Sequence, residues 1–212
     1  EPSLKTMFGR VPKTPFEIRQ TEAFRAASAS AEYFQGSEDG TRPGICYVPI
    51  LEAKKFNLTS GMESLFLHEA IPGHHYQISL QQENADLPKF RRFGGNSAYA
   101  EGWALYTESL GKELGLYTDP YQYMGALGDE MHRAIRLVVD AGMHTKNMTR
   151  EEAIKYMMDN EPLSEEGTVA EIERYMAIPG LAKVHRTDSQ GWLFPEKSIL
   201  IKNFVVPMDE RF

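Results

Sequence analysis

Residues 68–75 read His-Glu-Ala-Ile-Pro-Gly-His-His, and residues 99–108 read Tyr-Ala-Glu-Gly-Trp-Ala-Leu-Tyr-Thr-Glu. The two segments carry imidazole and carboxylate side chains, the groups that build a catalytic zinc site in many hydrolases. Apolar residues flank these groups in both segments, with a spacing that suits helices. The fold and the function therefore depend on whether the two segments meet around one metal ion.

The first segment departs from the regular His-Glu-x-x-His spacing, in which two histidines lie one helical turn apart with a glutamate as base. The position four after His68 is Pro72, and the next histidines are His74 and His75. On an ideal helix His75 would lie about 10 Å further along the axis, too far to share an ion. Pro disrupts helical hydrogen bonds and Gly permits unusual dihedral angles. We therefore predict a helix that bulges at Pro72-Gly73 and brings His74 back toward His68.

The second segment offers the remaining candidates. Glu101 lies 27 residues beyond His74, enough for a loop and an antiparallel return, so we expect the third ligand there. Glu108 lies on the same face of the predicted helix and can orient a ligand from behind. His75 is expected to support the site or to pack in a loop, and not to bind the ion.

Composition and charge limit the classes of function that the chain can have. The 212 residues fit one domain, and a hydrophobic content of 42% is enough for a core. A net charge of -7 argues against non-specific nucleic-acid binding. The single Cys46 excludes an internal disulfide framework and any zinc site built from cysteines. No stretch approaches the roughly 20 apolar residues of a transmembrane helix.

The hydrophobic pattern predicts a mainly α domain with a short strand at 45–50, which Pro49 places at a sheet edge. Residues 1–16 should be extended and residues 192–206 should form short strands. Helices are expected at 17–34, 97–114, 120–142, 150–159 after Thr149 and 164–177 after Ser164. A further helix is expected to begin at a Ser60 cap, with Glu63 completing a capping box, and to run to Glu69.

The segment from His68 to Gln77 closely resembles the signature of the bacterial family called domain of unknown function 885. Residues 100–106, 136–144 and 173–180 continue the match, which covers roughly residues 5–180. Members look like distant zinc metallopeptidases of the gluzincin type. The Glu101 segment is also similar to the third-ligand region of gluzincin aminopeptidases.

The resemblance implies a gluzincin-like catalytic domain over 1–180 and an atypical tail of unknown role at 181–212, since the family pattern is lost there. Family members are usually much longer, so the chain would correspond to their catalytic C-terminal part. The ligands of one Zn²⁺ would be His68, His74 and Glu101, and Glu69 would be the general base.

Supporting residues are predicted from the chemistry of peptide hydrolysis. The oxyanion needs a donor besides the metal, and Tyr175 and His144 are the candidates. Arg174 and Arg136 could bind a substrate carboxylate, although helix salt bridges to Glu171 or Asp140 are the more common outcome for such arginines.

The sequence thus predicts a zinc-dependent peptidase that acts on small peptides. Two alternatives stay open: an inactive, truncated metal-binding or scaffold module, and a zinc hydrolase that acts on non-peptide amides or esters. The family resemblance weakly favours a periplasmic or secreted location. The exo- or endopeptidase mode and the oligomeric state are left undetermined.

Overall fold

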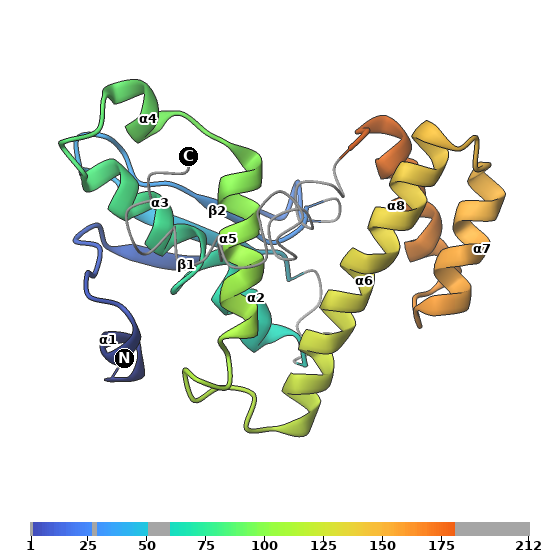
Figure 1. Cartoon of the computed structure of the whole chain (residues 1–212), viewed down its shortest axis with the longest axis horizontal. Helices are drawn as coiled ribbons and strands as arrows, with labels where there is room; N and C mark the ends of the chain where they lie inside the picture. Colours follow the sequence, from blue (N-terminus) through green and yellow to red (C-terminus); the bar gives the residue numbers. More distant parts are fainter. Residues whose placement is uncertain (1, 27–28, 51–59, 181–212) are drawn as a thin grey trace, which may run out of the picture.

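The computed structural model describes residues 2–26, 29–50 and 60–180. This part is mainly helical, as predicted, with one three-stranded sheet (Figure 1). The elements are α1 (Pro2–Met7), β1 (Phe16–Gln20), β2 (Glu32–Phe34), β3 (Gly44–Val48), α2 (Met62–Glu69), α3 (His74–Glu83), α4 (Lys89–Phe93), α5 (Ser97–Ser109), α6 (Pro120–Thr145), α7 (Arg150–Asn160) and α8 (Glu165–Ala177). The tail at 181–212, with the strands predicted at 192–206, lies outside the described residues.

The sheet corrects the expectations for the N-terminal third of the chain. Residues 1–16 include the short helix α1, and 17–34 is not a helix but contains most of β1 and all of β2. The sheet order is β1-β3-β2, with β1 parallel and β2 antiparallel to β3. Strand pairing overrides the helix-compatible local pattern here, because a strand gains its stability from its neighbours.

The predicted edge strand is instead the central strand. β3 ends at Val48, so Pro49 follows the strand and removes no hydrogen bond from either ladder. Ile45, Cys46 and Val48 are buried. Burial raises the pKa of the Cys46 thiol to about 12, with a smaller contribution from Glu69.

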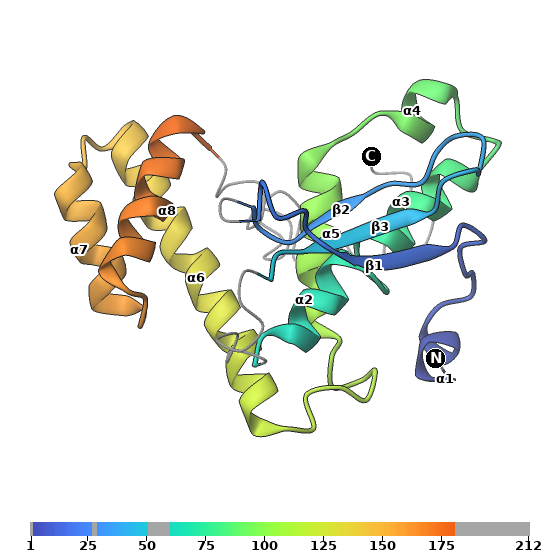
Figure 2. The same ribbon diagram turned by 180° about the vertical axis from the view of Figure 1, so that it is seen from behind.

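One face of the sheet is joined to α2 and α3 by aromatic contacts. Phe16 of β1 contacts Phe66 of α2 and His75 of α3, and Tyr33 of β2 also contacts His75. Figures 1 and 2, taken from opposite sides, show the sheet lying across one side of α3 and α5. The sheet thus packs against α2 and α3, the two helices that follow it in the sequence.

α6, α7 and α8 form a helical unit with its own core. Asp119, Thr149 and Ser164 cap the three helices, and Thr149 and Glu152 form a full capping box, which confirms the predicted starts at 150 and 164. The core of the unit consists of buried Ile135, Val139, Ala153, Met157, Ile172 and Tyr175.

The 26-residue helix α6 connects this unit to the rest of the molecule, packing on α2 at one end and on α7 and α8 at the other (Figure 1). Its predicted apolar pattern is only partly used for packing. Ile135 and Val139 are buried, whereas Met124, Leu127 and Met131 are exposed. No helix in the described ranges is long and apolar enough to cross a bilayer.

Candidate metal centre

The two histidines come from two helices and not from one bulged helix. α2 ends at Glu69 and α3 begins at His74, so the chain between them leaves helical geometry altogether. The Ile71–Pro72 peptide bond is cis. The prediction that the break lies at Pro72-Gly73 is confirmed, but the bulge is wrong, because these residues end one helix and start another.

Gly73 makes this break possible. A Cβ on Gly73 would lie 1.9 Å from the carbonyl oxygen of His68 and 2.2 Å from that of Leu67. Both obstacles are backbone atoms of the helix that carries His68, so they cannot move aside as a flexible side chain could. The close approach of α3 to the end of α2 therefore requires glycine.

Gly73→Ala is accordingly expected to lower the free energy of unfolding by about 3 kcal/mol, as overpacking against fixed atoms does. Urea unfolding followed by circular dichroism measures it. Gly95→Ala is the matched control, since nothing lies within 4 Å of a Cβ there, and its change should stay below about 1 kcal/mol. Equal stability of the two variants would contradict the steric argument.

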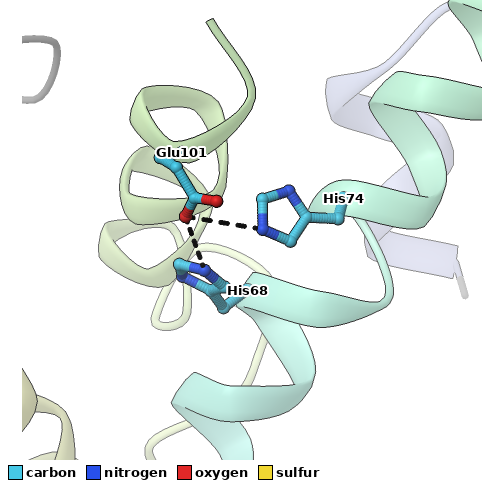
Figure 3. Close-up of side chains that lie close together, drawn as sticks. All are labelled: His68, His74 and Glu101. Atoms are coloured by element: carbon cyan, nitrogen blue, oxygen red, sulfur yellow. Dashed lines mark ion pairs between the residues drawn. The ribbon is translucent and has the colours of Figure 1, made fainter. Parts of the chain in front are cut away.

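The break brings His68 and His74 together with Glu101 of α5 (Figure 3). The Nε2 atoms of His68 and His74 lie 3.5 and 3.6 Å from Oε2 of Glu101. Potential ligand atoms of the three residues all lie within 4.8 Å of one another. Both histidines are buried, and Glu101 is partly exposed.

Two nitrogens and one oxygen form a donor set of the kind that catalytic zinc prefers, because it leaves a fourth position open. Ligands at about 2.0–2.1 Å from a tetrahedral ion lie roughly 3.3 Å from one another, close to the two separations observed here. The three side chains therefore fit a zinc ion with small adjustments.

The Nδ1 atom of His68, on the far side of the ring, faces a second carboxylate. It lies 2.6 Å from Oε1 of Glu108. Such a contact fixes the ring orientation, with Nε2 on the side of Glu101. Glu108 is itself buried and paired with Arg133 of α6, a residue that the sequence analysis did not single out. Nothing in the local sequence distinguishes Arg133 from the other charged residues of α6.

The charges of the cluster favour a cation. Burial lowers the pKa of His68, but hydrogen bonds to Glu101 and Glu108 outweigh it and raise that pKa to about 9. Glu69 is buried beside the cluster, and burial raises its pKa despite the opposing effect of His68 and His74. A carboxylate with a raised pKa is suited to accept a proton near neutral pH.

His75 lies outside the three-residue cluster. Its Nδ1 atom is 3.0 Å from the Tyr33 hydroxyl and 3.3 Å from Ser79 Oγ, and its ring packs on Phe16. Burial lowers its pKa, so the ring is neutral near pH 7. His75 therefore links α3 to the sheet.

The four supporting residues lie in the α6–α8 unit. The Tyr175 hydroxyl is 3.4 Å from His132 Nε2, and His144 Nε2 is 3.0 Å from the Tyr175 carbonyl oxygen. Arg136 lies over the Tyr175 ring, and Arg174 pairs with Glu171 as the helix salt-bridge alternative anticipated. These contacts are internal to the unit, so the oxyanion and substrate roles stay predictions.

The fold and the site together define a mainly helical protein with a His-His-Glu cluster held between α2, α3 and α5. The chain belongs to the bacterial family of proteins of unknown function DUF885, whose sequence model matches residues 1–185. No curated protein matches the chain.

Several chains of solved structures resemble this one, among them one from Colwellia psychrerythraea and one from Shewanella oneidensis. A protein of Colwellia psychrerythraea described as a "putative lipoprotein" is 40% identical, with a TM-score of 0.85 over 91% of this chain. A protein of Shewanella oneidensis described as a "putative lipoprotein of unknown function" is 23% identical, with a TM-score of 0.69 over 91% of this chain, and supports the fold alone. The match covers 33% and 37% of the two relatives, so this chain spans about a third of their length.

Proposed function

We propose that this chain is the metal-binding catalytic part of a gluzincin-like zinc hydrolase that cleaves peptide bonds. One observation carries the proposal: ligand atoms of His68, His74 and Glu101 converge to within 4.8 Å, although the residues come from three helices. Buried charged groups are usually paired with one another or bound to a metal. Two imidazoles that face one carboxylate are a donor set that suits zinc.

His68, His74 and Glu101 would hold the zinc ion, which would supply a Lewis acid for the substrate carbonyl and lower the pKa of a bound water molecule toward about 7. Glu69 accepts a proton from the attacking water and delivers it to the leaving nitrogen. Glu108 holds the ring of His68, and the partly exposed Glu101 side chain lies where solvent and substrate can reach. The proposal does not depend on the oxyanion and substrate roles predicted for Tyr175, His144, Arg136 and Arg174, because their contacts lie within the α6–α8 unit.

The net charge of -7 weakly favours small peptides as substrates over folded proteins. The description of the Colwellia psychrerythraea relative as a "putative lipoprotein" is weakly compatible with a periplasmic or secreted location for this chain. The substrate preference depends on the proposed hydrolase activity, whereas the location does not.

Metal analysis of the purified chain, combined with digestion of a mixed peptide library, tests the proposal. We expect one zinc per chain, cleavage of library peptides, loss of cleavage after chelation with EDTA and recovery when zinc is added back. Simple esters and non-peptide amides are assayed in parallel.

The outcomes separate the alternatives. Zinc binding without any turnover would favour a metal-binding or scaffold module. Turnover of esters or simple amides alone would favour a hydrolase of another substrate class. A chain that binds no zinc would overturn the proposal.

A further inference from the structure

The carboxylate of Glu108 is shared between His68 and a guanidinium group. Arg133 Nη1 donates to Glu108 Oε2 at 2.8 Å, and Arg133 Nη2 lies 2.8 Å from Glu108 Oε1. Oε1 also faces Nδ1 of His68 at 2.6 Å. Glu108 is 6% exposed, so these contacts are made away from water. Both carboxylate oxygens are therefore held by Arg133, one of them together with His68.

The two-point contact determines how the carboxylate is oriented. A guanidinium fork that meets both oxygens fixes the plane of the carboxylate, which a single donor cannot do. The backbone of Glu108 is held separately, because the Tyr117 hydroxyl donates to its carbonyl oxygen at 2.9 Å. With the backbone anchored by Tyr117, the remaining freedom of Glu108 lies in its side chain, and Arg133 removes it.

A second polar contact joins α6 to a different helix of the centre, α2, whereas Arg133 reaches Glu108 on α5. Ser64, one turn before His68 on α2, donates a hydrogen bond from its hydroxyl to Asp129, one turn before Arg133 on α6. α6 is thus held to α2 by Asp129 and, one turn further along, to α5 by Arg133. Only the contact of Arg133 leads to Glu108, which faces His68. The two contacts allow docking of α6 to be separated from support of the ligand.

We propose that Arg133 is a positioning residue of the metal centre: it fixes Glu108, and Glu108 fixes the ring of His68 with Nε2 directed at the ion. The inference rests on the proposed function, since it needs a metal at His68. It extends the site to α6, so that the α6–α8 unit contributes to metal binding without providing a ligand.

Arg133→Met removes the fork and keeps much of the apolar stem. We expect the zinc affinity, measured by competition with a chromophoric chelator, to fall about 10–100-fold, the usual effect of losing a group that orients a ligand. Arg133→Lys keeps the charge but not the fork, so its zinc affinity should lie between those of the wild type and Arg133→Met. With Co²⁺ in place of zinc, the visible spectrum of Arg133→Met should shift as the position of His68 loosens.

Ser64→Ala is the matched control, because it breaks the contact that docks α6 on α2 and leaves the contact between Arg133 and Glu108 in place. Its zinc affinity should stay within about twofold of the wild type. If Ser64→Ala and Arg133→Met lower the affinity equally, Arg133 acts only by docking the helices and the inference is wrong.

A double-mutant cycle tests whether Arg133 acts through Glu108. In a Glu108→Gln background, Arg133→Met should lower the zinc affinity by less than threefold, because the intermediary has already been altered. A wild-type chain that binds zinc, with Arg133→Met binding equally well, would overturn this inference alone. A wild-type chain without zinc affinity would overturn the proposed function as well.

Discussion

Replacing Glu69 by glutamine is expected to lower kcat for peptide cleavage by about 10²–10⁴-fold, the range that a general base contributes. Glutamine has nearly the same shape but cannot accept the proton of the attacking water. Because Glu69 is not among the three clustered ligand residues, the variant should still bind one zinc per chain. Steady-state kinetics on a peptide found in the library digestion, with metal analysis of the same sample, measures both quantities.

Glu130→Gln provides the control for this substitution. Glu130 lies on α6 with an exposed side chain, so the same chemical change there should leave kcat unaltered. Full activity of Glu69→Gln would show that another group removes the proton. Loss of zinc together with loss of activity would show that Glu69 serves the metal and not the water.

His74→Ala should weaken zinc binding and His75→Ala should not, although the two residues are adjacent. His74→Ala removes a proposed ligand, so the affinity should fall by more than the roughly 100-fold that loss of an orienting partner can cost. His75→Ala should retain one zinc per chain. It should instead lower the free energy of unfolding by about 2 kcal/mol, because it removes the partner of the part-buried Tyr33 hydroxyl and empties the space beside Phe16.

Chelator competition and urea unfolding of both variants separate the two residues. The distinction follows from the start of α3, which directs one histidine to Glu101 and the next to the sheet. Retention of zinc by His74→Ala, with loss in His75→Ala, would reverse the assignment of the ligand.

The parts of the fold that the sequence predicts well are those specified by local chemistry. The capping residues Thr149 and Ser164 predict where α7 and α8 begin, since a side chain there bonds to the first free backbone amides. At α2 the same reasoning fails: no side chain caps the helix at Gly61, and Glu63 instead accepts a hydrogen bond from the Tyr117 amide. The distant Tyr117 amide thus takes the place of Ser60, the local partner predicted for Glu63.

The sheet and the outer part of the site depend on contacts that no local pattern encodes. β1 lies in a stretch predicted as helix and forms a strand because β3 lies beside it. Arg133 lies 25 residues beyond Glu108 in the chain and meets it because α5 and α6 both pack on α2. The three clustered residues could be chosen in advance because zinc chemistry restricts the residue types, whereas an arginine that orients a carboxylate has no such signature.

The position of Cys46 has a consequence for chemical resistance. The thiol lies in the central strand of the sheet, and with a pKa near 12 it stays protonated and unreactive at neutral pH. Imidazole and carboxylate donors lack the sulfur whose oxidation inactivates thiolate-bound zinc. A centre built from His68, His74 and Glu101 would therefore have no ligand on the cysteine oxidation ladder.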